Sequence, residues 1–356
     1  MSFDYQKEFE ALIETVVKED ASDLHLSVGR YPTIRVSGFL SPLLNKKVLT
    51  AEDMVGFTSA ILSPDDKSIF IRNKEIDFSY QYKNNTVRFR GNGYFQQGAA
   101  AFAFRLIPRH IKSFAELNLP TILETFCEKR QGFFLVVGPV GHGKTTTLAS
   151  MIDYINANRS EHIISIEDPI EYIFEPKKSI IDQREVRVDT LDFGSALRSV
   201  FREDVNVILV GEMRGIDTMA TAVSAAETGH LVLSTLHTND AAQSINRIID
   251  SFPANQQDQI RVQLASSLTG IFSQRLIPRI SGGLIPAFEL LVANNATANL
   301  IRERRVHEIP TLIETGSEND MIDMNRSLAE LVRRGEITPE NANAYSPNPH
   351  SLSRLI

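Results

Sequence analysis

The strongest constraint on the fold is a glycine-rich loop between an apolar run and a predicted helix. Residues 133–137 are all apolar, which is typical of a strand buried on both faces. The next eight residues match GxxxxGK[ST], and a helix is predicted from Leu148. This order predicts an α/β nucleotide-binding domain. The residues expected to bind the phosphates are Gly138, Pro139, Val140, Gly141, His142, Gly143, Lys144, Thr145 and Thr146.

Each kind of residue in this loop has a physical task. The glycines let the backbone turn, so that several N–H groups face one anion. The helix that follows directs its positive end at the same anion. Lys144 adds a full positive charge near the β and γ phosphates, and the Thr145 hydroxyl is suited to bind Mg²⁺. We therefore expect ATP and Mg²⁺ as cofactors.

Length and composition narrow the class of protein. The 356 residues predict two domains. The 37 Lys and Arg residues against 44 Asp and Glu give a net charge of −7, which does not favour nucleic acid as the main partner. The single cysteine, Cys127, excludes a disulfide framework and is expected to be buried. We find no signal-peptide pattern and no run of about 18 apolar residues, so we expect a cytoplasmic protein without a membrane span.

The first part of the chain has the pattern of a small α+β domain. Apolar residues at helical spacing predict a helix over 5–19, and Thr50 is expected to cap a second helix that ends near Leu62. Alternating residues predict an antiparallel sheet, with a turn at Lys83-Asn84-Asn85. We expect these domains and segments: an N-terminal α+β domain over 1–107, a linker over 108–112, an ATPase domain over 113–345, and a mobile tail over 346–356.

Beyond the linker, short apolar runs alternate with predicted helices. This alternation is typical of a parallel sheet covered on both faces. The apolar runs are 133–137, 163–166, 207–210 and 231–233. The later helices are predicted over 241–249, 256–273, 324–332 and 339–344.

Acidic residues follow two of these runs, at the sheet edge where α/β proteins bind ligands. Glu167 is suited to orient or deprotonate a water molecule. Glu212 occupies the Walker B position and is a second candidate for that role or for the Mg²⁺ site. The sequence does not rank the two. Asp168 and Glu171 are expected either to hold Mg²⁺ through water or to cap the turn around Pro169.

Two histidines flank the run 231–233. His237 precedes Thr238 and Asn239, a polar cluster suited to sense the γ-phosphate, whereas His230 fits a structural and a catalytic role equally well. The N-terminal domain adds arginines that are either solvated strand-edge charges or groups that reach a neighbouring subunit's nucleotide. These arginines are Arg88, Arg90 and Arg105.

Four spaced motifs together resemble a known family. Besides the loop, residues 166–171 (Ile-Glu-Asp-Pro-Ile-Glu) resemble its Asp box and 202–214 its Walker B region. Residues 225–238 resemble its His box, and 182–186 (Asp-Gln-Arg-Glu-Val) match a further pattern. Over nearly its whole length the chain resembles the type IV pilus retraction ATPases, PilT and PilU, of the secretion ATPase superfamily.

The resemblance implies a PAS-like N-terminal domain and a RecA-like P-loop ATPase domain. It implies a homohexameric ring with ATP between subunits, placed at the cytoplasmic, inner-membrane base of a pilus machine. The implied partners are an inner-membrane platform protein and a paralogous ATPase. Catalytic or metal-linked roles carry over to Glu167 and Glu212. The extension ATPases usually have an additional N-terminal domain and four metal-binding cysteines, so this chain resembles the retraction branch.

Two positions depart from the family pattern. His142 replaces the serine common in the loop, and Ala298 stands where the family pattern Ala-Ile-Arg-Asn-Leu-Ile-Arg-Glu, here 296–303, has its first arginine. That pattern is linked to retraction, so an accessory, PilU-like ATPase is the alternative to a pilus retraction motor for twitching motility. A nucleic-acid translocase is a third hypothesis, because RecA-like domains also occur in helicases, but the acidic composition argues against it.

Overall fold

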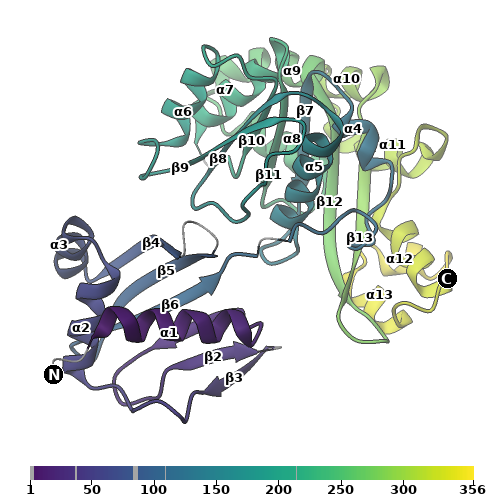
Figure 1. The fold of residues 1–356 in the computed structure, drawn as a ribbon. Coiled ribbons are helices and arrows are strands. Elements are labelled where there is room, and N and C mark those ends of the chain that lie inside the picture. The colour runs from purple at the N-terminus through teal and green to yellow at the C-terminus, as the bar shows by residue number, and fades with distance from the viewer. Residues whose placement is uncertain (1–3, 37, 83–86, 109, 214) are drawn as a thin grey trace. The chain divides into compact units, whose positions relative to one another are not determined.

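The computed structural model describes residues 4–36, 38–82, 87–108, 110–213 and 215–356. The chain divides into two compact units, Met1–Arg109 and His110–Ile356, and each is described by itself (Figure 1). The turn expected at 83–85 lies outside the described residues, as do Arg109 of the expected linker and Arg214 of the Walker B region.

The N-terminal unit is an antiparallel sheet with helices packed against it. The strand order is β3-β2-β1-β6-β5-β4, and every neighbouring pair is antiparallel. The strands are β1 (Asp23–Leu26), β2 (Thr33–Val36), β3 (Phe39–Pro42), β4 (Glu75–Tyr82), β5 (Val87–Gln96) and β6 (Ala99–Leu106). Helix α1 (Tyr5–Lys18) buries the apolar stripe that predicted it: Phe9, Leu12, Ile13 and Val16.

The next two helices begin at side-chain caps. In α2 (Ala51–Ile61), the Thr50 hydroxyl accepts from the Asp53 N–H, and the Asp53 carboxylate accepts from the Thr50 N–H. This reciprocal capping box satisfies two N–H groups at the helix start. Helix α2 ends before Ser63-Pro64, as expected. Ser63 is also the N-cap of α3 (Pro64–Asn73), a helix that the sequence pattern did not predict.

The second unit is built on a mixed sheet with the order β13-β12-β7-β11-β10-β8-β9. All neighbouring pairs are parallel except β12 with β13. The strands are β7 (Gly132–Val137), β8 (His162–Glu167), β9 (Ile180–Glu185), β10 (Val207–Val210), β11 (Leu231–Leu236), β12 (Leu268–Pro278) and β13 (Leu284–Val292).

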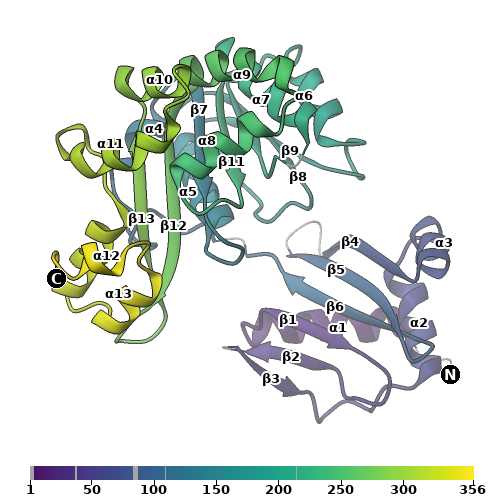
Figure 2. The same ribbon diagram turned by 180° about the vertical axis from the view of Figure 1, so that it is seen from behind.

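Helices cover both faces of this sheet (Figures 1 and 2). Alternate residues of β7 divide between two apolar cores: Phe133 and Leu135 pack with α6–α9, and Phe134 and Val136 pack with α4 and α5. This division explains why the strand is apolar throughout. The helices are α4 (Leu123–Cys127), α5 (Lys144–Asn158), α6 (Phe193–Val200), α7 (Ile216–Glu227), α8 (Ala241–Asp250), α9 (Ala254–Ser267), α10 (Asn295–Arg302), η1 (Val306–Glu308), α11 (Ile309–Thr315), η2 (Ser317–Asn319), α12 (Met324–Arg333), α13 (Pro339–Tyr345) and α14 (Pro349–Leu352).

Two expectations differ from the structure. The helix predicted over 256–273 ends at Ser267, and residues 268–273 begin strand β12 instead. The stretch 346–356, expected to be a mobile tail, contains α14, whose Leu352 is fully buried in a small core with Ile277 and Leu328. Within the described ranges, we find no helix with the length and apolar character needed to cross a bilayer.

Candidate active site

The glycine-rich loop connects β7 to α5 as the sequence predicts. Helix α5 starts at Lys144, and its N-cap residue Gly143 has a left-handed φ of 79°. No side chain caps this helix start. The N–H groups of its first turn are therefore suited to bind an anion, together with the positive end of the helix dipole.

Lys144 is buried, and its ammonium group faces the loop. Its Nζ donates to the carbonyl oxygens of Gly138 and Pro139, both at 2.9 Å, and lies 3.3 Å from His237 Nδ1. Burial lowers the pKa of Lys144, and the nearby Glu212 carboxylate partly opposes that effect. The loop carbonyls thus fix the position of a cation at the point where the motif places phosphate oxygens.

His237 lies between Lys144 and Glu212. Because Lys144 can only donate, His237 Nδ1 accepts, and the proton of a neutral ring is then on Nε2. That Nε2 is 3.7 Å from Glu212 Oε2. The three residues follow β7, β10 and β11, which are adjacent in the sheet. Parallel strands bring their carboxyl ends to one edge, and the structure accordingly brings Lys144, Glu212 and His237 together.

Glu167 ends β8, the next strand along this edge, and is only 4% exposed. Burial raises the pKa of Glu167 to about 7, although the Ser165 hydroxyl and the Glu171 N–H partly offset the effect. A Cβ atom on Gly211 would lie 3.5 Å from Glu167 Cγ, so the residue before Glu212 packs directly against Glu167. A carboxyl with a pKa near 7 is poised to accept a proton at neutral pH.

The segment after β8 contacts the start of α5. The Thr146 hydroxyl forms a 2.9 Å hydrogen bond with the Tyr172 hydroxyl, so this expected phosphate ligand has a protein partner. Asp168 Oδ2 is 3.5 Å from the guanidinium of Arg187, which is largely exposed. Glu171 donates its N–H to Glu167 at 3.3 Å. Tyr172 is a site residue that the sequence analysis missed.

The available ligands suit Mg²⁺ bound mainly by the nucleotide and water. Thr145 is exposed on the first turn of α5, and Glu212 follows β10 at the same sheet edge. Over the ranges that the structure describes, no three His, Cys, Asp or Glu side chains form a group able to hold a metal. Mg²⁺ in nucleotide sites typically takes one or two protein oxygens and completes its shell with phosphates and water, so Thr145 and Glu212 fit this ion.

Strand β12 supports the loop through Gln274, which the sequence analysis also missed. Gln274 Oε1 accepts from Thr147 at 2.6 Å, and Nε2 donates to the His142 carbonyl at 2.9 Å. A Cβ atom on Gly138 would lie 2.3 Å from the Gln274 carbonyl oxygen, and one on Gly143 would lie 2.9 Å from Gln274 Nε2. The glycines therefore allow the loop to pack closely against β12, and they also let its backbone approach an anion. A strand prediction for 268–278 would have revealed this residue.

His230 is not brought to this group. It precedes β11, whereas His237 follows it, so the two histidines lie at opposite edges of the sheet. Its Nδ1 is 3.0 Å from the Ala225 carbonyl oxygen, and its ring packs edge-on against Phe201. These contacts fit the structural role that the sequence analysis left open.

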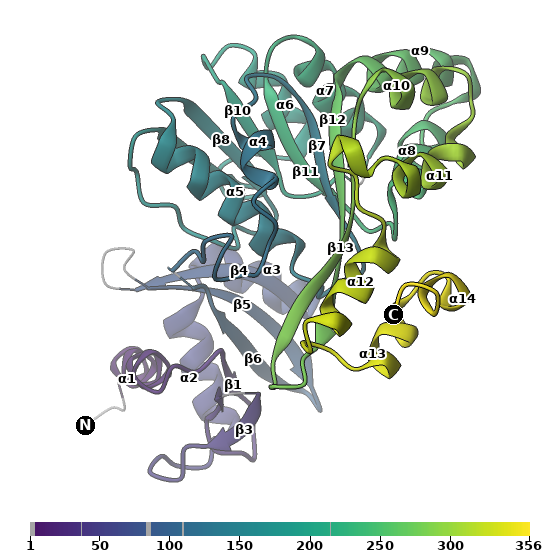
Figure 3. The same cartoon turned by 90° about the vertical axis from the view of Figure 1, so that its right-hand side faces the viewer.

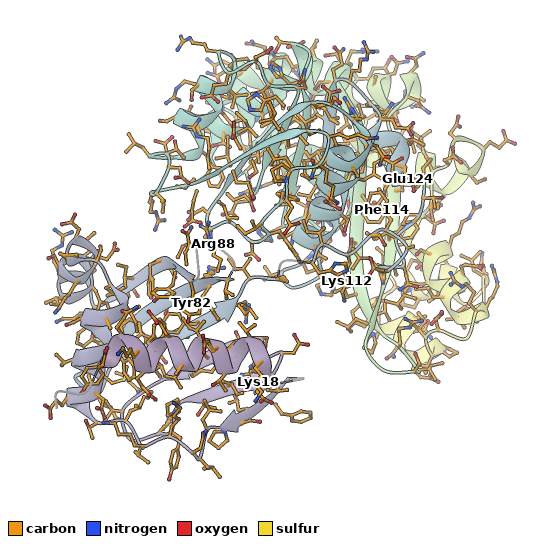
Figure 4. The ribbon with its side chains drawn as sticks, viewed as in Figure 1. Lys18, Tyr82, Arg88, Lys112, Phe114 and Glu124 are labelled. Carbon is orange, nitrogen blue, oxygen red and sulfur yellow. The ribbon has the colours of Figure 1, made fainter. Side chains whose placement is uncertain are left out.

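The three arginines lie on β5 and β6 of the N-terminal unit. Arg88, labelled in Figure 4, donates to the Ser79 hydroxyl at 3.1 Å. Arg105 forms a 3.0 Å ion pair with Asp23 and is largely exposed. Arg90 is the cross-strand neighbour of Arg105. Their approach to the nucleotide of another subunit stays a prediction.

The mostly parallel sheet, the P-loop and the polar groups at the carboxyl edge of the sheet define a P-loop nucleotide-binding protein. The chain belongs to the type II/IV secretion system protein family, whose family model matches residues 5–283. It is 43% identical to a twitching motility protein of Neisseria gonorrhoeae over 90% of this chain and 86% of that one. It is 41% identical to the type IV pilus retraction ATPase PilT of Pseudomonas aeruginosa, over 96% of this chain and 98% of that one.

A crystal structure of the pilus retraction motor PilT with bound ADP superposes with a TM-score of 0.90. That chain is 44% identical, and the match covers 96% of this chain and 98% of that one. The similarity confirms the predicted family and fold class, an α/β ATPase domain that follows a smaller α+β domain.

Proposed function

We propose that this chain is an ATP-hydrolysing motor subunit that powers type IV pilus retraction, and thereby twitching motility. The observation that carries the proposal is the group of Lys144, Glu212 and His237 at the edge of the sheet, with buried Glu167 on the neighbouring strand. The PilT relative and the ADP-bound PilT structure, each matched over nearly the whole chain, support the same function.

Each residue has a distinct role in the proposed reaction. Lys144 and the N–H groups of the loop bind the phosphates, and His237 senses the γ-phosphate through the proton on Nε2. Glu167, with a pKa of about 7, accepts the proton of the attacking water. Thr145 and Glu212 hold Mg²⁺, which neutralises phosphate charge when bound. Glu212, at 17% exposure of its side chain, is the more open of the two acids and suits the metal.

The proposed assembly is a homohexamer at the cytoplasmic base of a pilus machine, in contact with an inner-membrane platform protein. Arg88, Arg90 or Arg105 would reach the nucleotide of a neighbouring subunit, where one arginine adds roughly 10³ to 10⁵ in rate. Hydrolysis would reorient the N-terminal unit through the segment 107–112. ATPase activity that does not change when DNA is added is expected, since nucleic acid is not the proposed partner.

Lys144→Ala tests the enzymatic part of the proposal. We expect Mg²⁺-dependent ATP hydrolysis by the purified wild type and its loss in this variant. Lys178→Ala, which removes an exposed lysine outside the site, serves as the matched control and should retain activity. Equal turnover in wild type and Lys144→Ala would contradict the mechanism. A deletion strain with normal pilus retraction would contradict the biological role.

An accessory ATPase is the second candidate, and Ala298 favours it. This residue lies on α10 and packs against the main core, where the family pattern has an arginine. Slow turnover alone that rises sharply with a paralogous ATPase would support this role. In a deletion strain, Ala298→Arg should then restore retraction without the paralogue. Retraction by the unmodified chain alone would instead identify it as the main motor.

A further inference from the structure

Strand β12 continues beyond the end of its neighbour β7. The two strands pair from Leu268 to Ser273 of β12, but β12 extends to Pro278, whereas β7 ends at Val137 (Figures 1 and 3). On that side, the second half of β12 has no strand beside it within the described sheet. The phosphate-binding loop occupies this position instead, and its backbone passes close to Gln274.

His142 replaces the missing strand partner. Its Nδ1 accepts the backbone N–H of Leu276 at 2.9 Å, and its own carbonyl accepts from Gln274 Nε2 at 2.9 Å. One loop residue is thus bound at both ends to two positions of one strand. Because a backbone N–H can only donate, Nδ1 must carry a lone pair, and the ring must be neutral with its proton on Nε2.

Gln274 extends this connection from the loop to the helix. It is only 3% exposed, and its Oε1 accepts from Thr147, in the first turn of α5. The amide therefore joins β12, the loop and the helix start, which all contribute to the phosphate site. The three hydrogen bonds, at 2.6, 2.9 and 2.9 Å, have normal geometry for protein donors and acceptors.

We infer that His142 is a positioning residue for nucleotide binding, which holds the phosphate-binding loop against β12 in the conformation that receives the phosphates. The inference rests on the proposed function. A histidine reaches the Leu276 N–H through its ring, and Gln274 provides the second attachment. This role does not require the imidazole to touch the nucleotide, because its effect passes through the backbone of the loop.

The charges around His142 favour the neutral ring that this contact needs. Burial lowers the pKa of His142, and the neighbouring cations Lys144 and Arg275 lower it further. Protonation below that pKa would remove the acceptor at Nδ1 and place a third cation beside the other two. The hydrogen bond from the Leu276 N–H to His142 Nδ1 should therefore be present at neutral pH and be lost at acidic pH.

The experiment measures the affinity of the full-length protein for a fluorescent ADP analogue, together with ATPase kinetics. His142→Ala should weaken binding about five-fold to ten-fold, as expected for one lost hydrogen bond. The turnover number should stay within about two-fold, because the interaction serves ground state and transition state alike. His142→Asn, whose Oδ1 can accept the same N–H, should recover most of the affinity. His350→Ala removes an exposed histidine and is the control.

Measuring the affinity over a series of pH values gives a second test, which does not need the alanine variant. As pH falls through the lowered pKa of His142, wild-type affinity should fall relative to His142→Asn, which has no proton to gain. The inference would be overturned if wild type and His142→Ala bound ADP equally well, or if His142→Asn did not recover the affinity. Parallel pH profiles of wild type and His142→Asn would also overturn it. A wild type that binds no ADP at all would instead refute the proposed function.

Discussion

Replacing Glu167 with glutamine should stabilise the protein and at the same time greatly slow ATP hydrolysis. Glu167 is almost fully buried, and burial raises its pKa from an ordinary 4.5 to about 7. The folded protein therefore holds this proton more tightly than the unfolded chain does. Stability consequently falls as pH rises from about 4.5, and the loss is complete somewhat above pH 7.

The magnitude follows from the separation of the two pKa values. A difference of about 2.5 corresponds to about 3 kcal/mol in the free energy of unfolding once the carboxylate is ionised in both states. Glu167→Gln keeps the shape of the side chain and removes the ionisation. We expect it to add about 3 kcal/mol at pH 8 and less than about 1 kcal/mol at pH 5, where the proton is still bound to the folded protein.

Thermal unfolding of the nucleotide-free protein at the two pH values measures this difference. For a unit of this size, about 3 kcal/mol corresponds to a Tm increase of roughly 6–12 °C at pH 8. Glu314→Gln removes an exposed carboxylate of α11 and controls for the change in net charge. The same Glu167→Gln preparation should lose at least about 100-fold in turnover if the carboxylate accepts the proton from water.

The result that would refute this reasoning is a Tm shift that does not depend on pH. An equal shift at pH 5 and pH 8 would mean that glutamine changes packing or hydrogen bonding rather than ionisation. Loss of stability at pH 8 would show that the ionised carboxylate has a partner that stabilises it. Retained turnover would remove Glu167 from the proton-transfer step and leave Glu212 as the candidate.

Three further predictions use other parts of the fold. Gly138→Ala should weaken nucleotide binding more than ten-fold in a titration, because its Cβ would lie 2.3 Å from the Gln274 carbonyl oxygen. A Cβ at Gly141 meets open space, so Gly141→Ala should have a smaller effect despite the φ of 81° at this position. Equal effects of the two substitutions would contradict the packing argument. Thr50→Ala should cost about 1 kcal/mol in the unfolding of the N-terminal unit by removing the α2 cap, and an unchanged midpoint would count against it. Cys127 is buried with a raised pKa, so it should resist a thiol reagent until denaturant is added, and rapid labelling of native protein would be inconsistent with the structure.

The sequence predicted the site residues that lie at or just beyond the carboxyl ends of strands. Glu167, Glu212 and His237 each come after a short apolar run, and parallel strands necessarily bring their carboxyl ends to one edge. His230 shows the limit of this reasoning. It is close to His237 in the chain, but it stands before the same strand, and the six residues of β11 separate the two. Position relative to the strand, rather than proximity in sequence, decides which side chains meet.

The support from β12 was not predictable because its first half continues a helical pattern. Ile260 and Leu264 lie on the buried side of α9, and Leu268 and Ile271 continue the same spacing into the strand. Periodicity therefore extended the predicted helix to Ser273. The actual change occurs at Leu268, the first residue of β12. Two residues later, Gly270 packs closely in the sheet, where a Cβ atom would meet the Phe126 ring and the Leu291 carbonyl oxygen. Tertiary packing, which the spacing does not contain, selects the strand.

Strand β12 also gives the nucleotide site a physical connection to the C-terminal helices. Gln274 holds the loop, while the next residue, Arg275, donates to the carbonyl oxygen of Tyr345 at the end of α13. Ile277 then packs in the core that contains Leu352 of α14. A change in the loop that displaces β12 must therefore alter contacts of α13 and α14, since cores resist deformation. One series of contacts thus joins the phosphate-binding loop, β12 and the C-terminal helices α13 and α14.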